Sequence, residues 1–100
     1  MRRADVISVI RAHADELRAA GVAHVSLFGS VARDEAGPDS DVDLIIEGPL
    51  ERPITLFSMA RAEAVLERIL SRPVDLTSNR GLANADRLRA RIEPDLTPIF

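Results

Sequence analysis

Hydrophobic residues recur every three or four positions in three segments of the chain, which is the spacing of one face of a helix. The first segment predicts an amphipathic helix over residues 3–20 that ends at Gly21. The second predicts a long helix over residues 54–70, and the third predicts a helix over residues 81–92 that Pro94 ends. The expected buried positions of these helices are Val6, Ile10, His13 and Leu17, then Leu56, Met59, Leu66, Ile69 and Leu70, and finally Leu82, Ala85, Leu88 and Ile92.

Between these helices, apolar and polar residues alternate with a period of two, which predicts β-strands. The strands are expected at residues 22–28, 42–47 and 74–77, and residues 96–100 are expected to add an edge strand. Residues 31–35 suit one or two further helical turns. The connections are long enough for helical crossovers, so the fold class is α/β (α+β), with a mixed sheet of three to four strands and flanking helices. Residues 1–100 have room for one domain.

The composition narrows the chemistry that the chain can perform. The sequence contains no Cys, Lys, Tyr or Trp, which excludes thiolate nucleophiles, Schiff bases, a P-loop lysine and the usual aromatic platform for stacking bases. Its net charge of −3 provides no broad basic surface, so we expect no direct contact with nucleic acid. No segment reaches the roughly 18 consecutive apolar residues that a membrane span needs. We therefore expect a soluble cytoplasmic protein. Its functional groups are expected to come from Asp, Glu, Arg, Ser, Thr or His.

Two aspartates open the strand at residues 42–47. Asp41 and Asp43 are two positions apart, so both carboxylates are expected on one face of the strand. Like charges this close repel unless a cation lies between them, and magnesium prefers such oxygen ligands. An ordinary explanation competes, because Asp39, Ser40 and Asp41 also suit a turn that caps its own backbone. Asp43 fits that explanation poorly, since its neighbours in the strand are apolar.

A glycine and a serine follow the strand at residues 22–28. Gly29 allows backbone N–H groups to approach a phosphate closely, Ser30 adds a hydroxyl, and Arg33 adds a guanidinium that can grip a phosphate with two hydrogen bonds. Taken alone, a Gly-Ser pair after a strand is also common as a plain turn, and Arg33 fits an exposed helix charge equally well. The combination of an anion-binding loop with a carboxylate pair is more specific, because a triphosphate with magnesium needs both.

These two segments resemble the signature of the DNA polymerase β-like nucleotidyltransferase superfamily, in its minimal branch. The matching stretches are Gly29-Ser30-Val31-Ala32-Arg33-Asp34 and Ser40-Asp41-Val42-Asp43-Leu44. The resemblance spans nearly the whole chain, and Asp75 occupies the position of the family's third carboxylate. The chain departs from the signature at Asp34, where the family has glycine. A carboxylate at this position could repel a triphosphate or could simply face solvent.

The resemblance implies roles for individual residues. It implies that Asp41, Asp43 and Asp75 bind two Mg²⁺ ions and that Asp75 also helps to deprotonate the attacking hydroxyl, although a strand-end Asp can merely cap a turn. Gly29 and Ser30 would hold the β- and γ-phosphates of ATP, while Arg33 would contact a phosphate or brace the loop. Other candidates favour structural roles: His13 as a packed residue, His24 without a visible partner, Asp39 in a turn or supporting the metal loop, and Arg87, Arg89 and Arg91 on a solvated helix face or partner surface.

The implied reaction is transfer of AMP from ATP to a hydroxyl group with release of pyrophosphate. A chain of 100 residues leaves no room for a separate acceptor domain, so the acceptor is expected on a partner protein. Minimal relatives of this kind resemble antitoxins paired with a HEPN-domain toxin, which implies adenylylation of a toxin tyrosine within a hetero-oligomer. Two alternatives stay open, namely a non-catalytic antitoxin that neutralises its partner by contact and a nucleotidyltransferase for a small molecule.

Overall fold

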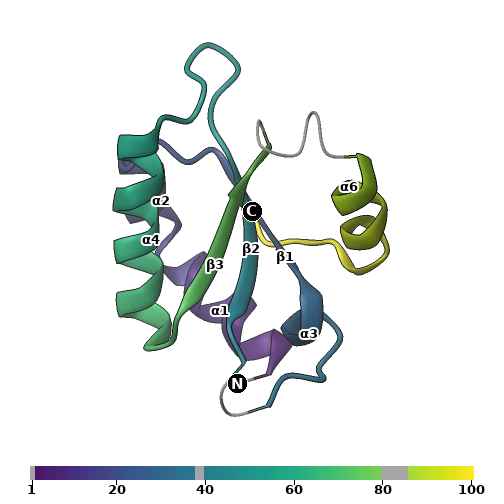
Figure 1. Cartoon of the computed structure of the whole chain (residues 1–100). Helices are drawn as coiled ribbons and strands as arrows, with labels where there is room; N and C mark the ends of the chain where they lie inside the picture. The colour runs from purple at the N-terminus through teal and green to yellow at the C-terminus, as the bar shows by residue number, and fades with distance from the viewer. Residues whose placement is uncertain (1, 38–39, 80–85) are drawn as a thin grey trace.

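The fold is a four-stranded mixed sheet with helices on both faces (Figure 1). The computed structural model describes residues 2–37, 40–79 and 86–100. Strands β1 (His24–Phe28), β2 (Val42–Glu47), β3 (Val74–Ser78) and β4 (Thr97–Pro98) lie in the order β3-β2-β1-β4. β1 is antiparallel to both β2 and β4, whereas β2 and β3 are parallel. The predicted mixed α+β sheet is therefore confirmed.

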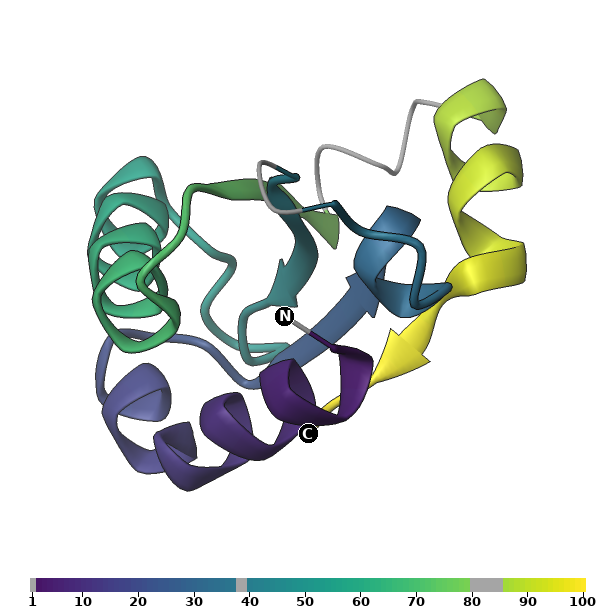
Figure 2. The ribbon, with the colours of Figure 1, turned by 90° about the horizontal axis from the view of Figure 1, so that it is seen from below.

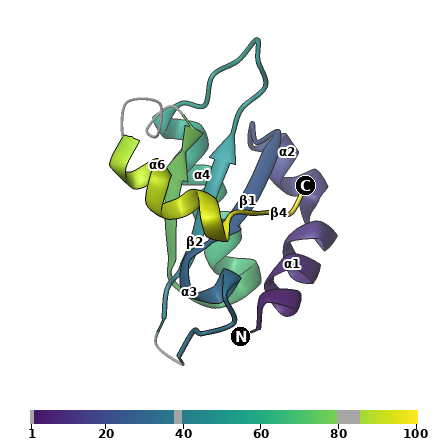
Figure 3. The same ribbon diagram turned by 90° about the vertical axis from the view of Figure 1, so that its right-hand side faces the viewer.

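Helices α1 (Arg3–Ala12), α2 (Ala14–Ala19) and α4 (Leu56–Leu70) cover one face of the sheet, and α6 (Asp86–Ile92) lies over the other (Figures 2 and 3). The short helix α3 (Gly29–Ala32) follows β1 directly, and a 3-10 turn η1 (Glu93–Asp95) connects α6 to β4. The main core fills the space between the sheet and the helices α1, α2 and α4. Its fully buried side chains include Val6, Ile10, Leu17, Val25, Leu27, Val42, Leu44, Ile46 and Leu66.

The predicted N-terminal helix is interrupted, so one helix over residues 3–20 was wrong. At His13 the backbone leaves the helical conformation (φ −112°, ψ 19°). The N–H of His13 donates to the carbonyl of Ile10, three residues back, while the His13 ring lies 2.9 Å from the carbonyl of Val9. This tighter turn separates α1 from α2, yet both helices still bury the expected positions Ile10 and Leu17. His13 itself is half-buried, in keeping with a packing role.

The long helix begins two residues later than predicted, at Leu56, and Leu56 was wrongly expected to be buried. The side chain of Thr55 accepts a hydrogen bond of 3.0 Å from the N–H of Ser58 and so caps the helix. Ala62, Leu66 and Leu70 form the buried stripe at a spacing of four residues. Leu56 lies about a third of a turn (~120°) away from Ala62 around the axis, and 87% of it is exposed.

The other predicted elements differ from the observed ones in their bounds. β1 starts at His24 rather than at residue 22, α3 starts at Gly29 rather than at residue 31, and the edge strand is only two residues long. The last helix is described from Asp86, so the expected positions Leu82 and Ala85 lie outside the described residues. None of the helices in the described ranges has the length and apolar content of a membrane span.

Candidate active site

The sheet register brings two of the three predicted carboxylates side by side. Asp43 of β2 is paired with Phe28 in antiparallel β1 and with Asp75 in parallel β3. Neighbouring strands lie about 4.8 Å apart, and paired residues project from the same face. Asp41 comes immediately before β2 and is exposed. The three aspartates thus lie near the end of the sheet where β2 and β3 begin.

Asp43 is the most perturbed carboxyl group of this set. It is half-buried, and its pKa is raised first by desolvation, then by the negative charges of Asp75 and Asp41, while Arg33 opposes the shift. A divalent cation bound by these oxygens would relieve both causes, because it replaces lost hydration and compensates like charge. The donor chemistry therefore fits magnesium. Within residues 2–37, 40–79 and 86–100, however, no three Asp, Glu or His side chains are gathered closely enough to hold a metal ion.

Two features of the structure favour glycine at position 29. Its φ of +75° lies in the region that residues with a Cβ rarely adopt. A Cβ at this position would also overlap Oδ2 of Asp43 and come within 3.0 Å of its Cγ. The start of α3 is thus packed directly against the Asp43 carboxylate. The first N–H groups of a helix lack partners within the helix, and the candidate phosphate loop therefore lies in contact with a candidate metal ligand.

Arg33 is held by two carboxylates. Its Nη1 donates to Asp95 Oδ2 at 2.6 Å and its Nε donates to Glu35 Oε2 at 2.9 Å. Hydrogen bonds with Glu35 and Asp95 raise the pKa of the Arg33 guanidinium. The contact with Asp95 joins the loop after β1 to the turn before β4. Arg33 therefore braces the loop in this structure, and its direct contact with a phosphate stays a prediction.

Asp34, the departure from the family signature, turns away from the loop. Its φ of +57° is a left-handed conformation, which explains why glycine suits this position. Its Oδ1 accepts a hydrogen bond of 2.8 Å from the backbone N–H of Arg3, the first residue of α1. Nε of Arg3 lies 4.0 Å from Oδ2 of the same carboxylate. Asp34 thus caps α1 instead of lining the candidate phosphate site.

A pocket of about 340 Å³ lies beside these groups, which is within the range of ligand sites. It is lined by residues of the loop after β1, by Asp43 and by the C-terminal segment, namely Phe28, Gly29, Ser30, Arg33, Asp43, Arg91, Ile92 and Asp95. From the sequence, Arg91 was expected on a solvated helix face or a partner surface, Ile92 was expected only as a buried position of the last helix, and Asp95 was not identified as a candidate. Only the position of Arg91 next to the apolar Ile92, which was expected to be buried, could have indicated that Arg91 lies near the sheet.

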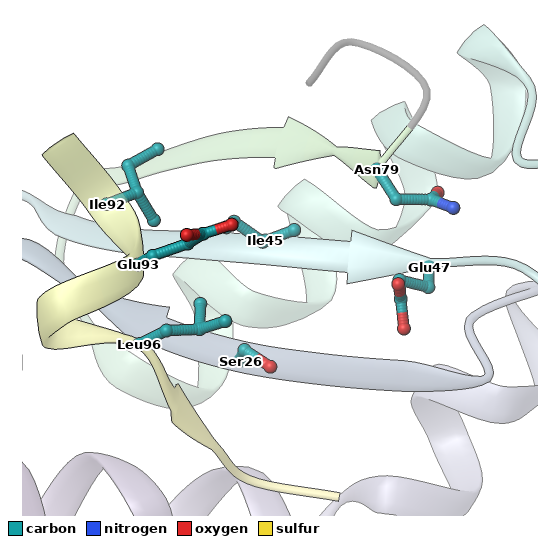
Figure 4. A pocket seen from close by; sticks show the side chains of 7 residues that line it. All are labelled: Ser26, Ile45, Glu47, Asn79, Ile92, Glu93 and Leu96. Carbon is teal, nitrogen blue, oxygen red and sulfur yellow. The ribbon is translucent and has the colours of Figure 1, made fainter. Parts of the chain in front are cut away.

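A second pocket, of about 250 Å³, lies further along the same face of the sheet (Figure 4). Ser26 and Ile45 form its floor, Ile92, Glu93 and Leu96 border it from the C-terminal segment, and Glu47 and Asn79 lie at its other end. Ile92 lines both pockets and packs on Ile45 and Phe28. The two pockets therefore share a wall.

His24, another candidate of the sequence, lines neither of these two pockets. His24 is exposed at the start of β1. Asp39 lies outside the described residues, whereas the neighbouring Ser40 Oγ accepts a hydrogen bond of 2.9 Å from the N–H of Gly37, as in a turn.

Comparison with known proteins gives consistent matches. A family model described as a nucleotidyltransferase domain matches residues 10–96. Protein adenylyltransferase MntA of Thermococcus cleftensis is 37% identical over 79 residues, which are 78% of each chain. The solved structure of a candidate minimal nucleotidyltransferase is 37% identical, with a TM-score of 0.78 and coverage of 98% of this chain and 96% of that one. A tri-AMPylated Shewanella oneidensis HEPN toxin in complex with MNT antitoxin gives a TM-score of 0.63 at 15% identity, covering 94% of this chain and 71% of the matched chain, which shows likeness of fold.

Proposed function

The chain belongs to the nucleotidyltransferase domain family, and from that premise we propose that it transfers AMP from ATP to a hydroxyl group of a partner protein. The observation that carries the proposal is the contact between the Gly29 turn and Asp43, with Asp75 in register beside it. This arrangement supports a site in which the loop at Gly29 would bind phosphate beside a set of carboxylates. A magnesium nucleotide needs both within one site.

Three aspartates would bind the metal ions and accept a proton at the carboxylate end of the site. Asp41, Asp43 and Asp75 would hold two Mg²⁺ ions, which supply charge compensation for a phosphoryl transfer when they are bound. The raised pKa of Asp43 supports this assignment, because burial first, and then the charges of Asp75 and Asp41, disfavour its negative charge when no cation is bound. Asp75 is exposed, so an incoming hydroxyl group can reach it. Asp75 would accept the proton of that hydroxyl.

The loop after β1 would bind the other end of the nucleotide. Gly29 and Ser30 would hold the β- and γ-phosphates of ATP, and Arg33 would fix the loop through Asp95 and Glu35 or turn to a phosphate. The acceptor oxygen then forms a bond to the α-phosphorus as the bond to the bridging oxygen of the β-phosphate breaks. AMP stays on the acceptor, and pyrophosphate leaves from the Gly29-Ser30 side.

The proposed acceptor is a tyrosine hydroxyl of a HEPN-type toxin, with the chain acting as its antitoxin in a hetero-oligomer. The MNT antitoxin that shares the fold is solved with an AMPylated HEPN toxin. The chain also exposes apolar side chains where β2 connects to α4: Leu50 is fully exposed, and Leu56 and Phe57 are 87% and 74% exposed. Exposed apolar residues are typical of a protein contact surface where they form one patch, and these three lie close together in the sequence.

Calorimetric titration of ATP, with and without magnesium, tests the nucleotide site. We expect the wild type to bind ATP in a magnesium-dependent manner and an Asp41→Asn/Asp43→Asn variant to lose this binding. The matched control Glu51→Gln/Glu63→Gln removes two exposed carboxylates away from the site and should bind like the wild type. Equal ATP binding by the wild type and the Asp41→Asn/Asp43→Asn variant would refute the assignment of the site.

Co-expression with a HEPN-type toxin and mass spectrometry test the acceptor. The toxin should gain the mass of an AMP group on a tyrosine when the wild-type chain is present, and should stay unmodified with the Asp41→Asn/Asp43→Asn variant. If that variant still neutralised the toxin fully, neutralisation by contact alone would replace the enzymatic account. Adenylylation of free small molecules without any protein partner would instead favour a small-molecule nucleotidyltransferase.

A further inference from the structure

The pocket at Gly29 and Ser30 contains two arginines in different states. Arg33 donates to two carboxylates, Glu35 and Asp95, so its positive charge is already compensated by two negative charges. Arg91 lines the same pocket from α6 and is exposed. Within the described part of the chain, Arg91 has no ion pair and no hydrogen-bond partner.

Charge balance shows why this difference matters. Besides the two arginines, the pocket is lined by the carboxyl groups of Asp43 and Asp95, so its formal charge is no more than neutral even with both arginines counted. A triphosphate brings several negative charges into this space. Arg33 already donates to Glu35 and Asp95, and these two carboxylates compensate its charge, whereas Arg91 can turn to a phosphate with its charge uncompensated by any described partner. A free guanidinium can also bind a phosphate with two parallel hydrogen bonds.

The position of Arg91 is fixed by its neighbour in the chain. Ile92 is buried against Ile45 and Phe28 on the open face of the sheet. Asp95, three residues later, is tied to Arg33. Both contacts hold the C-terminal segment beside the loop after β1, and Figure 3 shows α6 and η1 in front of the sheet, near α3. The backbone of Arg91 is thus anchored while its side chain remains available.

We propose that Arg91 binds the β- and γ-phosphates of the nucleotide opposite Gly29 and Ser30, while Arg33 positions the loop. This inference rests on the proposed function. It makes the C-terminal segment part of the nucleotide site, with Arg91 stabilising the negative charge that develops on the departing pyrophosphate. Arg91 touches the phosphates directly, and Asp95 acts through Arg33 as a positioning residue.

Titration of magnesium-ATP and of AMP into full-length variants tests this assignment. Arg91→Gln should weaken ATP binding at least about tenfold, with a smaller effect on AMP, because AMP lacks the β- and γ-phosphates. Arg87→Gln, which makes the same change at an exposed position of the same helix, should leave both affinities within about twofold of the wild type. Arg91→Lys should restore part of the ATP affinity, since it retains the charge but loses the paired hydrogen bonds.

Two outcomes would overturn the assignment without affecting the proposed function. One is an Arg91→Gln variant that binds ATP as tightly as the wild type, and the other is an equal loss for ATP and AMP. If the wild-type chain bound no ATP with magnesium, both the role of Arg91 and the proposed nucleotide site would be refuted. Circular dichroism of each variant separates a loss of binding from a loss of fold, and we expect unchanged spectra because Arg87 and Arg91 are exposed.

Discussion

Asp34 allows a sharp test of whether the departure from the family signature affects the nucleotide or the fold. Its carboxylate accepts a hydrogen bond from the first N–H of α1 at 2.8 Å, and its backbone is left-handed at φ +57°. Replacing a capping residue with alanine costs about 1 kcal/mol. Alanine also tolerates the left-handed region worse than aspartate, which adds up to about 1 kcal/mol. Asp34→Ala should therefore lower the free energy of unfolding by about 1–2 kcal/mol.

Asp34→Gly separates the two contributions. It loses the same hydrogen bond, but glycine adopts the left-handed backbone without strain. Even after the greater entropy of its unfolded chain is counted, this recovers roughly 0.5–1 kcal/mol of the free energy of unfolding. We therefore expect the free energy of unfolding of Asp34→Gly to lie within about 0.5 kcal/mol of that of the wild type. For a domain of this size, 1 kcal/mol corresponds to roughly 4–8 °C in the melting temperature, so thermal unfolding resolves the two variants.

The affinity for magnesium-ATP is the second measurement, and it tests whether Asp34 affects the nucleotide. Because the Asp34 carboxylate is half-exposed and turned toward Arg3, all three proteins should bind magnesium-ATP within about twofold of each other, as expected for a screened surface charge. Tenfold tighter ATP binding by Asp34→Gly would refute this reasoning, because it would mean that the carboxylate repels the phosphates. Equal melting temperatures for Asp34→Ala and Asp34→Gly would refute the account of the backbone.

Three further predictions concern the site and the fold. Gly29→Ala should abolish magnesium-ATP binding and destabilise the chain by at least about 1 kcal/mol, because its Cβ meets Asp43 and its φ is positive; calorimetry and thermal unfolding check this. The raised pKa of Asp43 means that the folded state favours the protonated carboxyl group, so the free energy of unfolding falls as the pH rises through that pKa. In magnesium-free buffer at pH 7, Asp43→Asn should therefore unfold at a higher temperature than the wild type. This gain should vanish toward pH 3, where the wild-type carboxyl group is protonated. Thr55→Ala should lower the free energy of unfolding by about 1 kcal/mol, because the N–H of Ser58 loses its capping partner. Leu66→Ala should lower it by about 2–5 kcal/mol, because it leaves a cavity in the core. A urea titration that ranked these two variants in the opposite order would contradict the described packing.

Much of the fold could be predicted because it depends on local periodicity. The alternation at Val42–Glu47 predicted β2 to the residue, and the three-to-four spacing located α4 to within two residues. The exceptions have local causes that periodicity does not report. The break at His13 depends on a side chain bonding to the carbonyl of Val9, and the exposure of Leu56 depends on which side of α4 meets the sheet.

The candidate site divides in the same way. The order of residues along the chain determined that Gly29 and Ser30 follow a strand and that Asp41 and Asp43 open the next one, since neighbours in sequence must be neighbours in space. The tertiary structure alone decided that Asp75 aligns with Asp43, that Asp34 caps α1, and that Arg33 pairs with Asp95. It also brought Arg91 to the loop after β1. These contacts join residues that are 31 or more positions apart, and such pairs are set by strand register and helix packing, which no local pattern of residues specifies.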